Sequence, residues 1–186
     1  MNHVPSRVSA HEARAFFTHR RWRNLFGLLL PHETVSATGV RLPKLEQVWL
    51  GYYWIDLRVR IGTTPAVQSI SVEGHSGAFA LFELHAALRD DPIEGPTFPP
   101  AISENEAVQI GREECLKNIL RRRSQQKKPA IEETLATSIF YYPYWVWYYA
   151  RRGRLDMRLM DAYTTGPGGN RTRAGLLSAF VQSRKR

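Results

Sequence analysis

The residues with the clearest chemical potential are cations placed around a run of aromatic side chains. The cations are Arg121, Arg122, Arg123, Lys127, Lys128, Arg151 and Arg152, and the aromatic residues include Tyr142, Tyr144, Trp145, Trp147 and Tyr149. Rings that stack on bases, flanked by cations that bind phosphates, are typical of proteins that bind single-stranded nucleic acid. A strand covered on both faces, by a helix and by a second module or subunit, needs the same rings. We favour the second interpretation, in which rings left exposed form a protein interface.

The candidates for catalysis and metal binding are weaker. The six histidines are scattered, and His11 and His19 are two helical turns apart, too far to share a metal ion. The single cysteine, Cys115, excludes an internal disulfide and a metal site built on cysteines. Ser76, in the sequence Gly-His-Ser-Gly, lacks the Gly-x-Ser-x-Gly spacing of a nucleophile turn. We therefore expect no enzyme, no metal and no cofactor. A catalytic site assembled between modules is the weaker alternative.

One loop has some potential to bind phosphate. Residues 166–173 are rich in glycine and precede a predicted helix, whose free backbone N–H groups, together with Arg171 and Arg173, could hold an anion. The loop lacks the Lys-Ser/Thr of a P-loop. A plain turn with Thr172 as the helix N-cap is the favoured interpretation. Asp56 and Asp156 are expected to form cross-strand ion pairs with neighbouring arginines.

The composition is typical of a soluble globular protein. Its positive charge indicates either an anionic partner or a basic surface exposed to solvent. The chain has 186 residues, 43% of them hydrophobic, and a net charge of +9. Residues 49–100 carry −3 of this charge and residues 101–186 carry +8. The polar start predicts no secretory signal, and the aromatic run 139–150 is shorter than the roughly 20 residues of a membrane helix. We expect a cytoplasmic protein with no integral membrane segment.

One pattern of landmarks occurs twice along the chain. Ser9-Ala10-His11-Glu12-Ala13 returns 94 residues later as Ser103-Glu104-Asn105-Glu106-Ala107, and each Ser-x-x-Glu predicts a capping box that starts a helix. The aromatic runs that begin at Gly51 and Pro143 lie 92 residues apart. Two acidic turns, at Glu73 and Asp161, follow 88 residues apart. A duplicated unit without a chemical motif favours a binding or assembly module.

The residue pattern predicts the elements of each copy. In the first, we expect a helix from Ser9 to Leu25, a loop with a possible edge strand over 32–46, strands over 47–61 and 67–73, and a helix over 77–89. A strand over 78–84 is the alternative to that last helix. In the second, we expect a helix over 104–123, strands over 134–151 and 154–161, and a helix over 173–183. Four prolines in residues 90–100 predict a stiff linker without regular structure.

The second copy resembles a PepSY-type domain. The resemblance rests on Ser103, Glu106 and Ala107 at the start of the helix and on the turn Asp161-Ala162-Tyr163-Thr164-Thr165-Gly166. It covers residues 103–166, with a more divergent copy at 9–77. It implies an α+β fold with a helix across an antiparallel sheet, and a role in protein binding or inhibition without catalytic residues. Many members are exported, and this chain shows no export signal.

Together these observations predict an α+β protein of two tandem helix-strand-strand-helix modules with antiparallel sheets. The expected domains are residues 1–89, a proline-rich linker over 90–102, and residues 103–186 with a basic tail. The leading hypothesis for function is a non-enzymatic, protein-binding adaptor or assembly module, whose partner is another protein or a second copy. The alternative is a nucleic-acid-binding protein that uses the basic and aromatic surface of the second module.

Overall fold

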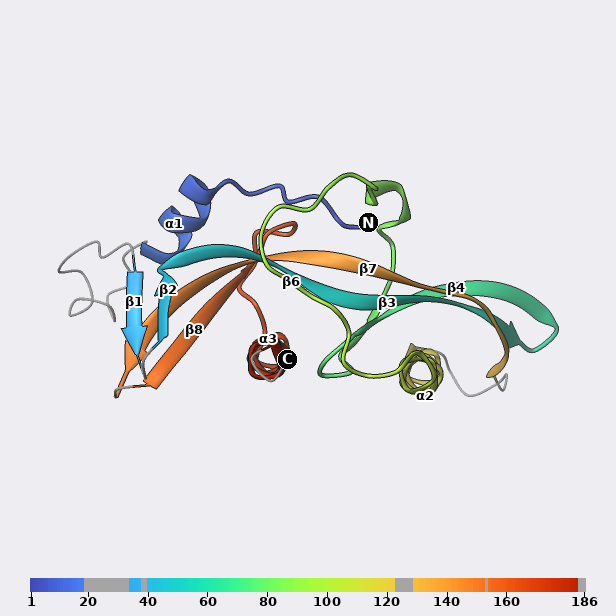
Figure 1. The fold of residues 1–186 in the computed structure, drawn as a ribbon. Coiled ribbons are helices and arrows are strands. Elements are labelled where there is room, and N and C mark those ends of the chain that lie inside the picture. Colours follow the sequence, from blue (N-terminus) through green and yellow to red (C-terminus); the bar gives the residue numbers. More distant parts are fainter. Residues whose placement is uncertain (19–33, 38–39, 123–128, 153, 184–186) are drawn as a thin grey trace.

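The computed structural model describes residues 1–18, 34–37, 40–122, 129–152 and 154–183 (Figure 1). The strands are β1 (Thr34–Ala37), β2 (Val40–Pro43), β3 (Leu45–Ile61), β4 (Thr64–Glu73), β5 (Phe79–Leu81), β6 (Thr97–Phe98), β7 (Pro129–Arg151) and β8 (Arg154–Asp161). The helices are α1 (Ala10–Thr18), α2 (Glu104–Arg122) and α3 (Asn170–Ser183), with a short 3-10 turn η2 (His85–Ala87). No helix in these ranges is long and apolar enough to cross a membrane.

Two long antiparallel strands, β3 and β7, form the centre of the molecule. They pair from Leu45 opposite Trp147 to Ile61 opposite Pro129. β4 extends this ribbon beside β3 at one end, and β8 extends it beside β7 at the other end. The sheet order is β5-β4-β3-β7-β8, and β6 adds a short parallel pairing with β3. β1 and β2 form a separate hairpin.

The two ends of this ribbon bury opposite faces. Near α3, β3 contributes Val48 and Leu50 to the core, whereas near α2 it contributes the odd-numbered residues from Tyr53 to Val59. Successive side chains of a strand point to opposite faces, so α2 and α3 cover different faces. Both helices nevertheless lie on the lower side in Figure 1. The twist of the long ribbon between them explains this arrangement.

The prediction of two tandem helix-strand-strand-helix modules is wrong, because one six-stranded sheet joins both halves of the chain. The first strand of each predicted hairpin pairs with its counterpart in the other half. Residues 77–89 are also no helix. They form β5 and η2, so the alternative of a strand in this region is closer to the structure.

The duplicated landmarks instead lie about an approximate two-fold axis within this sheet. Leu50 and Tyr142 are cross-strand partners and also lie 92 residues apart in the sequence, so the axis passes between them. Each opening helix packs on the hairpin of the other half. Ala13 of α1 packs with Trp145, and Ala107 of α2 packs with Tyr53.

An equivalent hydrogen bond, from an aromatic side chain to a backbone carbonyl, accompanies each of these two helix contacts. The Tyr53 hydroxyl donates to the carbonyl of Ile102 at 2.9 Å, and the Trp145 indole donates to the carbonyl of Val8 at 2.9 Å. Val8 and Ile102 are the residues just before the two capping serines. The two halves are therefore equivalent in backbone path even where their side chains differ.

The segment predicted as a structureless linker is part of the sheet. β6 pairs with Trp49 and Leu50 of β3, and Phe98 is buried against α3. The equivalent segment at the start of the chain is residues 2–4, which pair in the same way with Tyr141. Prolines did not prevent strand pairing here because the pairing is only two residues long.

Local predictions agree better with the structure. Both capping boxes are present, with the Ser9 hydroxyl accepting from the Glu12 backbone N–H at 3.3 Å and Ser103 accepting from Glu106 at 3.3 Å. β8 has the predicted bounds, and α2 runs from Glu104 to Arg122, the last residue described before the gap at 123–128. α3 begins at Asn170, so Thr172 lies inside the helix and not at its cap. The predicted part of the first helix beyond Thr18 lies outside the described residues.

Candidate functional site

The predicted basic residues lie at the two ends of β7. Arg121 and Arg122 end α2, near the start of the strand, whereas Arg151 and Arg152 lie at its turn into β8. Arg123, Lys127 and Lys128 lie outside the described residues. β7 has 23 residues, which corresponds to roughly 70 Å at the usual rise per residue. The described members of this set therefore do not form one surface.

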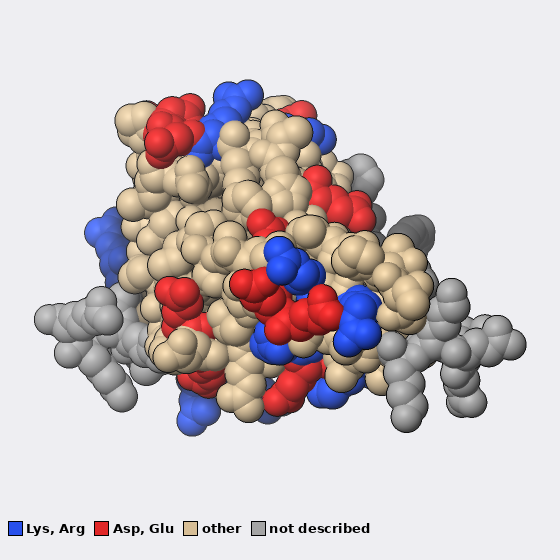
Figure 2. Space-filling view, turned by 90° about the vertical axis from the view of Figure 1, so that its right-hand side faces the viewer, with Lys and Arg blue, Asp and Glu red and all other residues tan. Residues whose placement is uncertain are grey.

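The end of the molecule that carries the β3–β4 turn has both signs of charge. Figure 2 shows basic and acidic side chains side by side on this end. Arg58 pairs with Glu133 at 2.7 Å, Arg60 pairs with Glu132, and Lys117 pairs with Glu114 at 2.7 Å. Arg58 thus pairs with a glutamate of β7 and not with Asp56 as predicted.

The predicted aromatic residues are mostly used inside this chain. Tyr144 and Trp145 are buried. Trp147 is stacked on Phe17 of α1 at 5.6 Å between ring centroids, with the Lys44 ammonium 4.9 Å from its ring. Tyr142 and Tyr149 are partly exposed and donate their hydroxyl groups to Asp161 and Asp156. Both faces of this aromatic strand are therefore covered largely by the chain itself.

The most ordered polar feature is a turn that occurs twice, after β4 and after β8. The Glu73 carboxylate accepts hydrogen bonds from the backbone N–H groups of His75 at 2.8 Å and Ser76 at 2.6 Å. The Asp161 carboxylate accepts from Tyr163 at 2.9 Å and Thr164 at 2.8 Å. In each turn the fifth residue has a positive φ, 67° at Gly77 and 64° at Thr165. The two acids are thus equivalent turn organisers.

The two turns meet through tyrosines near the two-fold axis. Tyr52 is the register partner of Glu73, and Tyr144 is the register partner of Asp161. The two hydroxyl groups lie 2.8 Å apart and share a hydrogen bond. Burial raises the pKa of both tyrosines well above the ordinary value, and the nearby carboxylates raise it further. The pair is therefore neutral and joins the two halves.

This cluster is built for structure more than for proton transfer. Glu73 is fully buried, and its two oxygens are taken by the turn and by the Ser76 hydroxyl. A general base needs a carboxylate within reach of a substrate. In the described ranges, no three His, Cys, Asp or Glu side chains gather as metal ligands would. The cluster fixes where β4 and β8 end.

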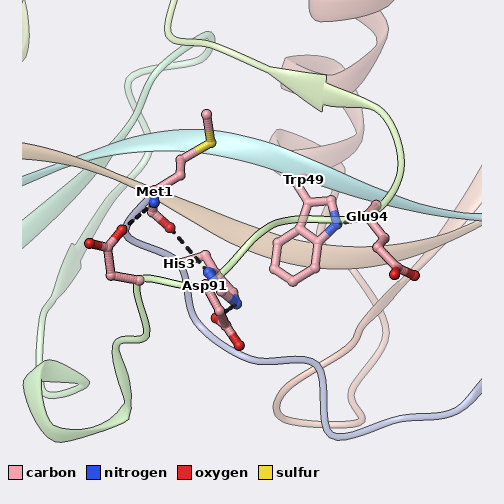
Figure 3. A network of polar contacts seen from close by, with 6 residues as sticks. Met1, His3, Trp49, Asp91 and Glu94 are labelled. Carbon is pink, nitrogen blue, oxygen red and sulfur yellow. Dashed lines mark hydrogen bonds and ion pairs between the residues drawn. The ribbon is translucent and has the colours of Figure 1, made fainter.

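The N-terminal segment is fastened to the same sheet by a polar network (Figure 3). His3 is 5% exposed, and its ring nitrogens lie 3.2 Å from an Asp91 carboxylate oxygen and 3.1 Å from the Met1 carbonyl. The ring packs edge-on against Trp49, whose indole donates to the Glu94 carbonyl at 2.8 Å. These contacts hold residues 1–4 beside β7.

One stretch of strand edge is left open in this sheet. Tyr141 of β7 exchanges backbone hydrogen bonds with Asn2 and Val4, so its N–H and C=O point away from β3. Backbone groups alternate along a strand, so those of Thr137 and Ile139 point the same way. No described residue pairs with them. Ile139 and Leu135 are 43% and 39% exposed.

The other edges of the six-stranded sheet are covered over most of their length within the described part of the chain. β5 and Phe82 cover β4 from Ser69 onward, and of the two outward positions before it Pro65 lacks an N–H to offer, whereas Val67 has no described backbone partner. The loop at 166–168 bonds back onto β8 at Leu159 and Asp161. β6 covers β3 at Trp49 and Leu50. The window from Ala136 to Ile139, where two successive outward residues have backbone groups without a described partner, is therefore the candidate functional site.

Comparisons of this chain with protein-family models, with curated proteins and with solved structures give no match. The resemblance to PepSY-type domains therefore rests on the quoted residues alone. It remains a prediction.

Sequence reasoning did not find the open edge. Which edge of a strand is free depends on its partners, and the β3–β7 pairing was not predicted. From the sequence, Glu73 was recognised only as a repeat landmark, and Asp161 as a landmark and as part of the PepSY-like turn. Gly77, four residues after Glu73, was the sequence signal that could have identified the turn, because glycine readily adopts the positive φ found there.

Proposed function

We propose that this chain is a non-enzymatic, protein-binding assembly module, which adds an extended segment of a partner protein to the open edge of β7. Strand addition supplies affinity through backbone hydrogen bonds and specificity through alternate side chains. The window from Ala136 to Ile139 offers both. Its outward backbone groups have no partner among the described residues, and the exposed Ile139 side chain offers an apolar contact.

The approximate two-fold axis supports this proposal and predicts the direction of the added strand. The positions of β3 equivalent to Thr137 and Ile139 are Leu45 and Gln47. There, the chain itself supplies a neighbouring segment. A Cβ atom on Gly95 would lie 3.0 Å from the Gln47 carbonyl, and β6 continues parallel to β3. A partner segment beside β7 is thus expected to run parallel to it.

Charge does not oppose an incoming strand at this edge. The nearest acids of β7, Glu132 and Glu133, are neutralised by Arg60 and Arg58 of β3. Charged residues are a common protection of strand edges, and here they are engaged within the chain. The apolar pair Leu135 and Ile139 is therefore what a partner meets.

A second copy of this chain fits the window less well than an extended segment does. Antiparallel pairing of two copies about Ser138 would place Leu135 of one copy opposite Tyr141 of the other. The outward groups of Tyr141 already bind residues 2 and 4. Register irregularities on either side of Leu57 and Arg58 in β3 also distort β7 beyond the window. A short, free segment avoids both obstacles.

The test compares three variants in affinity capture followed by hydrogen exchange on the purified pair. Ile139→Lys and Thr137→Pro should lose the partner, because they place a charge on the window or remove an outward N–H. Val67→Lys is the matched control, since Val67 is an exposed apolar strand residue of β4, on the opposite side of the sheet from the window. The partner should protect the amides of Thr137 and Ile139 from exchange.

A partner retained equally by all three variants, or bound without protection of these amides, would refute the proposal. Light scattering of the free protein tests whether two copies of this chain associate. A dimer that Ile139→Lys dissociates would replace the partner protein by a copy of this chain.

A further inference from the structure

The hairpin of β7 and β8 presents one face away from the α3 core. Tyr148 pairs with Met157, and both are buried in that core. Because side chains alternate along a strand, the flanking register pairs point to the opposite face. These pairs are Trp147 with Arg158, Tyr149 with Asp156, and Arg151 with Arg154. We call these six residues, with Arg152 in the turn, the hairpin face.

Positive charge is concentrated on the hairpin face without compensation. Arg151 and Arg154 are direct cross-strand partners, and like charges in this relation destabilise a sheet. All four arginines are exposed. No carboxylate in the described ranges forms an ion pair with any of them. The one acid, Asp156, is paired with Arg173 of α3.

An aromatic ring lies among these cations. Tyr149 is partly exposed, and the Arg158 guanidinium lies 5.9 Å from its ring centroid. Its hydroxyl donates to Asp156 at 3.0 Å, which fixes the ring on the sheet. Trp147 is unavailable, because Phe17 and Lys44 pack against it. The hairpin face thus offers one positioned ring surrounded by cations.

We propose that the hairpin face binds single-stranded nucleic acid, with the arginines on phosphates and Tyr149 stacked on a base. An acidic peptide would match the charge but leave the ring without a stacking partner. A duplex keeps its bases stacked inside, so it could not use the ring either. This binding goes beyond the proposed protein-binding function, and it uses the opposite end of β7.

The test measures fluorescence anisotropy of a labelled oligothymidine of about 20 nucleotides with the full chain over a range of salt. Four arginine contacts predict a slope of log K against log salt of roughly −3. Arg151→Gln with Arg154→Gln should halve the slope approximately and weaken binding at least tenfold. Tyr149→Ala should weaken binding by roughly 5- to 150-fold, whereas Tyr149→Phe should not.

The matched control is Arg121→Gln, an exposed arginine at the end of α2, which should bind as the wild type does. The proposal is overturned if Arg121→Gln weakens binding as much as the double variant, or if oligothymidine does not bind at low salt. It is also overturned if a duplex of equal length binds as tightly, or if polyglutamate competes equally. Ile139→Lys should leave this binding intact, so the outcome is independent of the β7 edge.

Discussion

Glu73→Gln is a sharp test of the duplicated turn. The substitution keeps the size of the side chain but removes its charge and one of its two acceptor oxygens. In the wild type one oxygen accepts from the His75 N–H, and the other accepts from the Ser76 N–H and hydroxyl. Whichever way the new amide is oriented, its NH2 group faces at least one backbone donor.

The expected cost follows from these contacts. An unsatisfied buried donor costs about 1–3 kcal/mol, and the remaining hydrogen bonds lose their charge assistance. Removal of the charge also removes the cost of burying it, because Glu73 is fully buried. The balance predicts a loss of about 2 kcal/mol in the free energy of unfolding. For a chain of this length that is a fall of roughly 4–8 °C in Tm.

Urea and thermal unfolding followed by circular dichroism measure this difference. Glu94→Gln is the control, since its side chain is exposed, and it should stay within about 0.5 kcal/mol of wild type. Asp161→Asn should cost less than Glu73→Gln, because Asp161 is partly exposed and water can bind its freed donors. A Glu73→Gln protein as stable as the control would show that this carboxylate does not hold the turn.

Three further predictions concern the turn after β8 and two residues near the approximate two-fold axis, Gly51 and Tyr144. Thr165→Gly should stabilise the protein by about 0.5–1 kcal/mol in urea, because a β-branched residue is strained at its φ of 64°; a loss of stability would contradict this. Gly51→Ala should destabilise it by about 2 kcal/mol or more, because a Cβ atom there would lie 2.5 Å from Pro100; a neutral result would refute the close approach. Burial raises the pKa of Tyr144. Because the folded state then holds its phenolic proton more tightly than the unfolded state, the free energy of unfolding should fall as pH rises above about 10. Absorbance at 295 nm should show this tyrosine ionising only as the chain unfolds.

Acid stability offers one more measurement, on Asp156. Burial opposes ionisation of this carboxyl, but hydrogen bonds from Arg173, the Met157 N–H and Tyr149 outweigh it and lower its pKa. Its contribution to stability is therefore complete above the ordinary carboxyl value of about 4 and is lost as pH falls through the lowered value. Asp156→Asn should be less stable than wild type at neutral pH and approach it below pH 3. A difference that does not change with pH would contradict this assignment.

The sequence was informative where structure is decided locally. Capping boxes at Ser9 and Ser103 start α1 and α2 as predicted. The alternation from Tyr53 to Val59 identified the buried face of β3. Both signals act over a few residues, through hydrogen bonds to the adjacent turn or through side chains that alternate between two faces.

The sequence did not reveal which strands pair with each other. The alternating pattern of β3 fits either β4 alone or β4 with a second neighbour, so the 17-residue ladder with β7 left no local trace. The exchange of α1 and α2 between halves depends on that ladder and was missed with it. The pairing of β6 with β3 was missed because the prolines on either side of β6 predict a loop.

The approximate two-fold arrangement has a consequence for how such a chain could arise. Two identical chains of half this length would build the same sheet as a symmetric dimer, with β3 and β7 as one isologous strand pair and the helices swapped between subunits. Fusion through residues 78–100 would make that association intramolecular, so it would no longer depend on protein concentration. Each half would then be free to diverge. The arginines of the hairpin face and the neutralised edge at Glu132 and Glu133 would be products of that freedom.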